Sequence, residues 1–275
     1  MIYLTGDCHG EFGRFSKKQR MRLPFELTPD DFVVICGDMG LLWAEDKEFA
    51  YYQKWLSALP FTILWIQGNH ENYDLIAKYP VCMWHGGKVR HIVPDKIILL
   101  ERGQVFTIEE KRFFTFGGAS THDIQGGILD KTSPTYEKDR RRANKRGLPY
   151  RVRGVSWWAQ ELPSEQEMQE GRENLRKAGS QVDYVITHCL AGKMQDRLEA
   201  ILGAGEGLAH GYRVHEKDIL TAYFDELETM LQYKHWFCGH YHVNLTLDER
   251  HTVLYQQFIA LEHPSGQGTH FCTLP

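Results

Sequence analysis

The chain has 275 residues, of which 42% are hydrophobic and 25% charged, and a formal net charge of −4 at pH 7. These fractions are ordinary for a soluble globular protein. A chain of this length buries an ample core without the disulfide bonds or structural metals that small domains need. The weak negative charge gives no global reason to expect a nucleic acid or an anionic membrane as partner. No apolar run approaches the ~20 residues that cross a bilayer.

The six cysteines show no C-x-x-C spacing, and we interpret them as reduced thiols. Cys36 and Cys238 close apolar runs with strand character, where a disulfide would be awkward. Because disulfides are rare in the cytosol, this usage predicts a cytoplasmic protein. No signal peptide is expected, since its removal would take the polar pair Asp7 and His9 with it.

The first eighty or so residues alternate between strand and helix patterns. Ile2–Thr5, Phe32–Cys36 and Thr62–Gln67 are apolar runs that predict strands. Asp46–Ala58 and Tyr73–Lys78 have the apolar spacing of helices. This alternation predicts βαβ units with parallel strands.

From residue 81 the pattern changes to short β-like runs. The predicted strands are Lys96–Leu100, Val105–Ile108 and Arg112–Phe116, with Glu101–Gly103 as a hairpin connection. A second β region follows residue 240, where Asn244–Asp248 and Thr252–Ala260 flank a turn at Glu249–Arg250. We therefore expect an α/β fold in which two facing sheets form a β-sandwich flanked by helices.

The segment from Lys131 to Arg153 does not fit this scheme. It carries nine basic side chains against Glu137 and Asp139, and it has no apolar period. We interpret it as an exposed basic insertion that forms a mobile loop. It is either a solvated loop or a contact for a phosphate-rich substrate or nucleic acid.

Eight polar side chains follow apolar runs: Asp7, His9, Asp38, Asn69, His70, His188, His240 and His242. Four glycines stand directly between a run and its first polar residue: Gly6, Gly37, Gly68 and Gly239. A strand that ends in this way delivers its side chain at the carboxyl edge of a sheet, where open α/β sheets bind ligands. Glycine also lets the backbone approach a bound ion. Because the clusters span most of the chain and must converge, we predict a single domain over residues 1–275.

Carboxylate, amide and imidazole donors without thiolate suit manganese, iron or zinc in a reactive site. Two divalent cations would outweigh Asp7, Asp38 and a bridging hydroxide, and the net positive charge would hold a phosphate. Asp38 stands alone in its cluster and is the natural bridging carboxylate. We predict two divalent transition-metal ions, with manganese as the first choice, that lower the pKa of a bridging water.

The order D-x-H, G-D, G-N-H-E, H, G-H-x-H is similar to that of the calcineurin-like metallophosphoesterase family, over nearly the whole chain. The resemblance implies a four-layer α-β-β-α fold with a dinuclear centre at the strand ends. It also implies hydrolysis of a phosphomonoester, phosphodiester or nucleotide by in-line attack of a metal-bridging hydroxide.

The same resemblance implies a role for each cluster residue. The first metal would be held by Asp7, His9, Asp38 and His242. The second would be held by Asp38, Asn69, His188 and His240. His70 resembles the family's catalytic histidine, which is not a ligand, faces the substrate and helps the leaving oxygen depart.

The sequence departs from the protein phosphatases of this superfamily. Their motif G-D-x-x-D-R-G carries a phosphate-clamping arginine, whereas Asp38 is followed by Met39–Trp43 without one. Protein-phosphatase activity is therefore not predicted. The stretches Phe116–Asp123 and Ser156–Ser164 resemble small prokaryotic and phage metallophosphoesterases, which imply no particular substrate.

The remaining polar residues have weaker interpretations. Ser120 and Asp123 follow a Gly-Gly turn and are weak candidates for substrate binding, with an ordinary polar loop as the alternative. We expect no metal at the other histidines: His85, His91, His122, His210, His215, His235, His251, His263 and His270. Cys8 lies between two predicted ligands, but its side chain should point to the opposite face.

Three functions follow from these patterns. The favoured one is a dinuclear phosphoesterase that acts on a small phosphorylated substrate. The first alternative is a nuclease whose insertion follows a nucleic-acid backbone, although the basic residues are confined to one segment. The second is a metal-bound interaction scaffold without catalysis, although all eight site residues are present. The sequence leaves the oligomeric state open.

Overall fold

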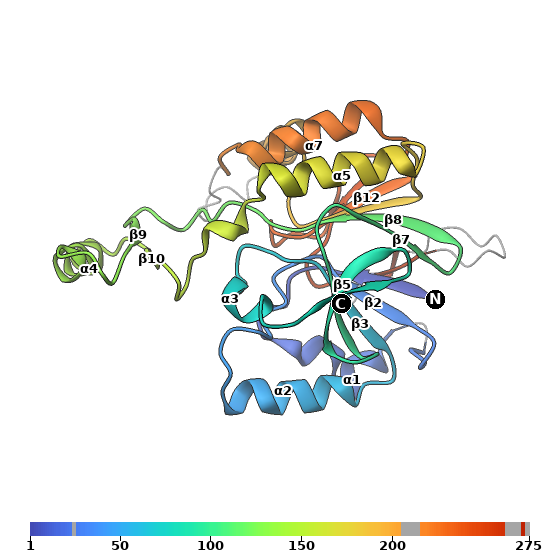
Figure 1. The fold of residues 1–275 in the computed structure, drawn as a ribbon, viewed down its shortest axis with the longest axis horizontal. Coiled ribbons are helices and arrows are strands. Elements are labelled where there is room, and N and C mark those ends of the chain that lie inside the picture. Colours follow the sequence, from blue (N-terminus) through green and yellow to red (C-terminus); the bar gives the residue numbers. More distant parts are fainter. Residues whose placement is uncertain (24–25, 205–214, 262–270, 273–275) are drawn as a thin grey trace.

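The structure is a computed structural model that describes residues 1–23, 26–204, 215–261 and 271–272. Two β-sheets lie face to face, and helices cover the outer side of each (Figure 1). The predicted α/β fold of two sheets flanked by helices is confirmed. Among the described residues, no helix is both long and apolar enough to cross a membrane.

One sheet has eight strands within the described residues, in the order β16-β15-β1-β2-β3-β6-β5-β4. They are β1 (Ile2–Thr5), β2 (Phe32–Ile35), β3 (Thr62–Trp65), β4 (Val81–Trp84), β5 (Gly87–Val93), β6 (Ile97–Leu100), β15 (Phe258–Ala260) and β16 (Phe271–Cys272). β1, β2 and β3 are parallel, as the alternating pattern predicts, and β6 also pairs in parallel with β3. The helical segments of this half are η1 (Phe12–Phe15), α1 (Lys17–Arg20), α2 (Lys47–Ser57) and α3 (Tyr73–Ile76).

The other sheet has six strands in the described part of the chain, in the order β13-β14-β12-β11-β8-β7. They are β7 (Gln104–Ile108), β8 (Lys111–Phe116), β11 (Tyr184–Thr187), β12 (His235–Cys238), β13 (Leu245–Thr246) and β14 (His251–Val253). The accompanying helices are η2 (Ala159–Glu161), α5 (Glu165–Lys177), α6 (Gly192–Ala204) and α7 (Ile219–Met230).

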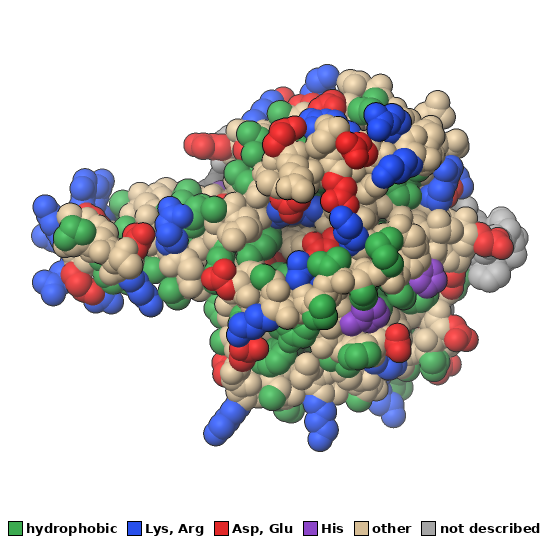
Figure 2. All heavy atoms as spheres, in the orientation of Figure 1, with side chains coloured by type: hydrophobic (Ala, Val, Ile, Leu, Met, Phe, Trp, Pro, Cys, Tyr) green, Lys and Arg blue, Asp and Glu red, His purple; other side chains and the backbone are tan. Residues whose placement is uncertain are grey.

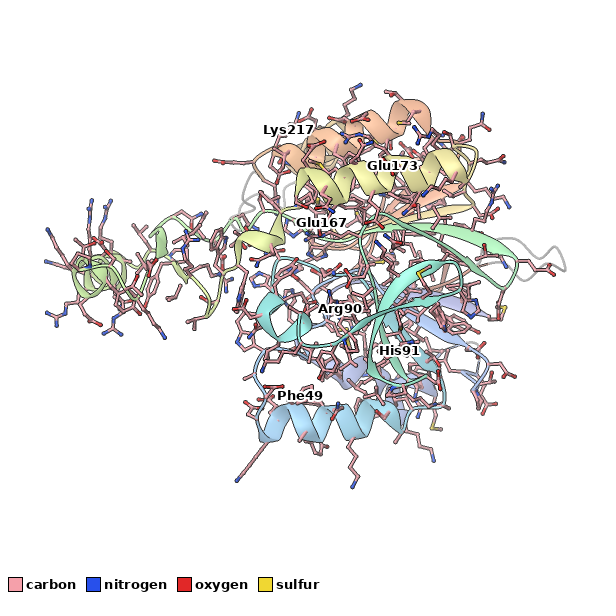
Figure 3. All side chains as sticks on the ribbon, in the orientation of Figure 1. Phe49, Arg90, His91, Glu167, Glu173 and Lys217 are labelled. Carbon is pink, nitrogen blue, oxygen red and sulfur yellow. The ribbon has the colours of Figure 1, made fainter. Side chains whose placement is uncertain are left out.

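The strand sequences account for the layers. Alternate side chains of a strand point to opposite faces of the sheet. On β1, Ile2 and Leu4 therefore enter the core between the sheets, whereas Tyr3 enters the core on the side of α2. Phe49 of α2 packs into that second core (Figure 3). Strands that are covered on both faces appear in the sequence as the continuous apolar runs described above.

The hairpin predicted at Glu101–Gly103 is wrong. β6 lies in the eight-stranded sheet and β7 in the six-stranded sheet, so the segment crosses from one sheet to the other. The buried Arg102 holds the crossing, because its Nε donates to Gly117 O at 2.8 Å and its Nη2 to Tyr73 Oη at 2.9 Å. A short polar connection looks the same in sequence whether or not its two strands pair.

The predicted strand Thr252–Ala260 is wrong in a similar way. It divides into β14 and β15, which belong to different sheets. The predicted turn at Glu249–Arg250 is confirmed, because β13 and β14 pair antiparallel across it.

The predicted loop at residues 131–153 is also wrong, since this segment is largely ordered. β9 (Ile128–Leu129) and β10 (Arg151–Val152) pair in parallel, and α4 (Tyr136–Lys145) connects them. Residues 128–153, called the arm from here on, project away from the two sheets (Figure 1). The buried residue of α4 is Ala143. Because α4 buries so little apolar surface, no apolar period in the sequence could reveal it.

One stability prediction concerns His251 on β14, which joins α7 to the six-stranded sheet. Its Nε2 lies 2.6 Å from Glu228 Oε1 and its Nδ1 lies 2.7 Å from Asp248 Oδ1. Burial disfavours the imidazolium, but the hydrogen bonds to both carboxylates outweigh this and raise the pKa of His251. Its stabilising effect is therefore complete below the unfolded pKa of ~6.5 and is lost as pH rises through the higher folded pKa.

We expect His251→Gln to lower the free energy of unfolding by about 1–3 kcal/mol at pH 6 and by less at pH 9, measured by urea titration. His235→Gln on the adjacent strand is the matched control. Burial, reinforced by the charge of His251, lowers the pKa of His235 to about 4, so near pH 6 only the unfolded state protonates this residue. The cost of His235→Gln should therefore be smaller at pH 6 than at pH 9, the opposite trend to that of His251→Gln. A cost of His251→Gln that is equal at both pH values would contradict the charged pairing.

Candidate metal centre

The predicted cluster residues lie at one edge, where the two sheets meet. Asp7, Asp38 and Asn69 follow β1, β2 and β3 of the eight-stranded sheet. His188 and His240 follow β11 and β12 of the six-stranded sheet. Parallel strands present their carboxyl ends on the same side. Neither sheet alone carries the full set, so the centre exists only when the sheets are packed together.

Two buried carboxylates are each held by a loop of another strand. Asp38 Oδ1 accepts a backbone N–H from the loop after β3 at 2.7 Å, and Asp7 Oδ1 accepts one from the loop after β12 at 2.9 Å. A Cβ on Gly68 would lie 2.0 Å from Asp38 Oδ1, and one on Gly239 would lie 2.2 Å from Asp7 Oδ1. These glycines thus make room for a carboxylate of a neighbouring strand.

Asp7, His9 and His242 form one compact donor group. Asp7 Oδ2 lies 3.5 Å from His9 Nε2 and 3.3 Å from His242 Nε2, and these two nitrogens are 2.8 Å apart. Asp38 Oδ2 lies 3.7 Å from His9 Nε2. The structure therefore brings together all four residues of the predicted first metal site.

Asp38 also faces the residues of the second site. Its Oδ2 lies 3.4 Å from His188 Nε2, which in turn lies 3.2 Å from Asn69 Oδ1. His188 Nδ1 is 2.8 Å from the carbonyl oxygen of Cys36, which can only accept a hydrogen bond. A proton on Nδ1 leaves the lone pair of Nε2 for a ligand. One oxygen of Asp38 thus lies between the two donor groups.

His240 has neighbours that the sequence did not predict. Its donor atom lies within 4.8 Å of those of His122 and His215, which were expected to be ordinary histidines. The His240 ring is also 5.0 Å from the His188 ring. His122 lies four residues beyond the Gly-Gly turn that follows β8 and is not the first polar residue after it, and His215 follows no predicted strand, so the strand-glycine pattern marked neither. The assignment of His240 to the second metal stays a prediction.

The other histidines expected not to bind metal fall into two sets. Those in none of the donor groups found within the described residues are His85, His91, His235 and His251. Those that lie outside the described residues are His210, His263 and His270.

The electrostatics of the centre fit divalent cations. Asp7 is fully buried, and its Oδ2 has no hydrogen-bond partner within the described structure. Burial opposes ionisation, but His188, His242 and His9 together hold the pKa of Asp7 well below its usual range. Burial and the neighbouring imidazoles lower the pKa of His240, which leaves it neutral as a metal ligand must be. Burial opposes the charge of His188, but Asp38 and Asp7 raise its pKa to about 9, so metal binding there would displace a proton. Anionic oxygens and imidazoles that give up their protons in this way are the donor set expected for manganese, iron or zinc.

Four of the predicted ligands have a left-handed backbone conformation. The φ angles are +50° at His9, +47° at Asp38, +70° at His240 and +51° at His242. Such conformations cost about 1–3 kcal/mol each for non-glycine residues and concentrate at functional sites. They turn the chain sharply just beyond a strand, so that these side chains face the centre.

Asn69 is oriented by residues that the sequence did not single out. Its Nδ2 donates to Thr121 Oγ1 at 3.3 Å, and Thr121 Oγ1 donates to Glu161 Oε2 at 2.5 Å. Glu161 also accepts from Trp157 Nε1 at 2.9 Å. With its amino group held in this way, Asn69 presents its oxygen to His188.

Ser120 and Asp123, the weak candidates for substrate binding, both bond to other side chains of the protein. Ser120 Oγ donates to Asp218, the N-cap residue of α7. Asp123 accepts two hydrogen bonds from Arg151, one of them from Nε at 2.9 Å. Ser120 thus joins a loop to a helix, whereas Asp123 holds an arginine near the centre.

Arg14 is a second residue that the sequence did not mark. Its Nη1 donates to Thr5 Oγ1 at 2.9 Å and to Tyr255 O at 2.6 Å, and its Nη2 donates to Asp7 O. The Tyr255 ring stacks on His242 at 4.9 Å. One guanidinium therefore ties the end of β1 to the loop after β14, and with it Asp7 to the support of His242.

His70 lies beside the donor groups and belongs to none of them. Its ring is 5.2 Å from that of His9, and its Nε2 is 3.5 Å from Arg151 Nη2. Burial lowers the pKa of His70, the charge of Asp38 opposes this shift and Arg151 adds to it. Arg151 stands at the base of the arm, and its side chain is only 18% exposed. In the sequence it was one of nine basic residues of the insertion, with nothing to distinguish it.

Comparison with known proteins agrees with this geometry. A family model described as calcineurin-like phosphoesterase matches residues 1–244. The comparison with curated proteins gives no match. Among solved structures, a phosphopantetheinyl hydrolase from Mycobacterium tuberculosis is similar, with a TM-score of 0.44 and 14% identity over 92% of this chain and 87% of that one. Because the family model covers most of the chain, the protein belongs to the calcineurin-like phosphoesterases and is a metal-dependent phosphoric ester hydrolase.

Proposed function

We propose that the protein hydrolyses a phosphate ester at two divalent transition-metal ions. The proposed ligands of the first are Asp7, His9, Asp38 and His242. Those of the second are Asp38, Asn69, His188 and His240. The observation that carries the proposal is the position of Asp38 Oδ2, 3.7 Å from His9 Nε2 and 3.4 Å from His188 Nε2. A shared ligand must face two donor groups in this way.

When bound, the cations would activate water and neutralise phosphate charge for an in-line displacement. The donor set favours manganese, with iron or zinc as alternatives. Arg151 offers its guanidinium to the phosphate oxygens, which match its planar fork of N–H groups. Asp123 holds that fork from the other side. The arm would thus supply the phosphate-binding arginine that is missing after Asp38.

His70 is placed to assist the leaving oxygen. It belongs to none of the groups of candidate metal donors. Its ring lies next to the His9 ring, and its Nε2 lies next to Arg151. Proton donation to a leaving group by a positioned imidazole is a common contribution to ester hydrolysis. An interaction scaffold without catalysis would need neither His70 nor a held Arg151 at this place, which favours the enzyme.

The first prediction concerns the shared carboxylate. Asp38→Ala should weaken both metal sites, because it removes a ligand from each. Metal content of the manganese-loaded protein would be measured by elemental analysis after dialysis. Asp38→Asn, which can still accept the backbone N–H of the loop after β3, separates loss of charge from loss of loop structure. One ion retained at full occupancy in both variants would show that Asp38 does not bridge.

The second prediction concerns His70. His70→Ala should keep its metal content and lower kcat by roughly 10²–10⁴-fold, the scale of general acid catalysis. The loss should be smaller for nitrophenyl esters, whose leaving groups need less protonation. An equal loss on good and poor leaving groups would indicate instead that His70 stabilises charge in the transition state.

The third prediction concerns Arg151. Arg151→Ala should lower kcat/KM for a small phosphomonoester by roughly 10²-fold or more, by analogy with the loss of one oxyanion donor. Added guanidinium ion should restore part of the activity, which a merely structural role would not allow. Arg153→Ala is the control, since Arg153 lies on the same arm with its side chain 56% exposed. Equal effects of the two substitutions, without rescue, would rule out phosphate contact by Arg151.

A further inference from the structure

The arm concentrates positive charge on a protein that is otherwise negative. Residues 131–153 hold nine basic and two acidic side chains, an excess of seven positive charges. Taking these seven from the chain total of −4 leaves −11 for the remainder. Figure 2 shows Lys and Arg side chains gathered on the projecting arm. A polyanion would be attracted to the arm and repelled by much of the remaining surface.

The charges of α4 are arranged along one side of the helix. Lys138, Arg141, Arg142, Lys145 and Arg146 follow the spacing i, i+3, i+4, i+7 and i+8, and all five are exposed. Residues at these intervals are neighbours on a helix, where like charges repel one another and destabilise the helix. We call these five residues the basic stripe.

The basic stripe has no partner of opposite charge in the described part of the chain. The ion pairs of the arm involve other residues: Arg140 with Glu137, Arg151 with Asp123, and Arg153 with Asp130. Because the buried residue of α4 is Ala143, this helix presents most of its side chains to solvent, the stripe among them. Side chains with terminal nitrogens surround α4 in Figure 3. An anionic partner would offset their mutual repulsion.

One end of α4 adjoins a cavity that Arg151 also lines. A cavity of about 510 Å³ is lined by Asn144 of α4, by Tyr150 and by Asp123 and Arg151. Arg151 in turn reaches to 3.5 Å from His70 Nε2. This cavity therefore adjoins both α4 and Arg151, which lies beside the place where we propose that a phosphate ester is cleaved.

We propose that the arm binds the sugar-phosphate backbone of a nucleic acid and directs one phosphodiester to the metal centre. The ten residues of α4 span about 15 Å, room for roughly four phosphates along one strand. An anionic membrane could also attract the arm, but it would not enter the cavity that leads to Arg151. The inference rests on the proposed phosphoesterase function and deepens it by naming the substrate class.

The test is the salt dependence of binding to a labelled DNA oligonucleotide with a phosphorothioate backbone, which resists hydrolysis. It uses the manganese-loaded full chain and fluorescence anisotropy. Replacing Arg141, Arg142 and Lys145 by Ala should weaken binding and make the plot of log K against log salt shallower by about two to three units. The matched control removes the same charge from exposed residues beside η1, as Lys17→Ala, Lys18→Ala and Arg22→Ala, and should leave the slope unchanged.

Equal losses in the two triple variants would show a net-charge effect and overturn the proposal. Arm-dependent binding to phosphatidylserine vesicles without binding to DNA would overturn it in favour of a membrane. Stronger arm-dependent binding of inorganic polyphosphate than of DNA would overturn the nucleic-acid assignment. Thermal melting of each variant separates a binding defect from unfolding. Hydrolysis of 4-nitrophenyl phosphate by the wild type is measured separately, so a failure of the phosphoesterase function is distinguished from a failure of the arm.

Discussion

The burial of two carboxylates at one point is the constraint on which the rest of the structure depends. Asp7 is 0% and Asp38 1% exposed. A buried charge without compensation lowers the free energy of unfolding by roughly several kcal/mol. Each carboxylate uses one oxygen to accept a backbone N–H and turns the other toward imidazoles. The close-approaching glycines, the left-handed ligand backbones and the packing of two sheets all bring compensating groups to these oxygens. The cations that the family requires would complete the compensation.

Side chains outside the centre hold its loops in place through hydrogen bonds. Arg102 crosses between the sheets and donates to Gly117 O and to Tyr73 Oη, which itself donates to Gly68 O at 2.8 Å. One buried arginine thus links the glycine loop after β3 to the glycine loop after β8. Through Thr121, Glu161 adds a further connection from η2 to the amide of Asn69. The precision of the centre therefore depends on side chains that never face it.

The arm adds to this scaffold a part with different physical properties. The two sheets are held together by large apolar side chains such as Trp65, Phe106 and Phe237, whereas the arm is a short helix on a two-stranded ribbon. It contributes little to the core and much to the electrostatic field. One of its contacts with the body is made by Arg151, which lies beside His70. Arg151 therefore joins the basic arm to the candidate metal centre.

The sequence by itself determined the strands that lead into the candidate centre, the parallel direction of β1, β2 and β3, and the polar residues that follow them. These depend on local patterns, because a buried strand must be apolar and a close approach to a carboxylate tolerates only glycine. Only the tertiary structure decided that residues 101–103 cross between sheets, that residues 131–153 form a helical arm, and that Thr121, His122, His215, Arg14 and Arg151 surround the centre. An exposed basic helix has no apolar period, and a lone arginine or histidine has the same local sequence whether it faces solvent or a metal. Their roles arise from contacts between segments far apart in the chain, which no local pattern encodes.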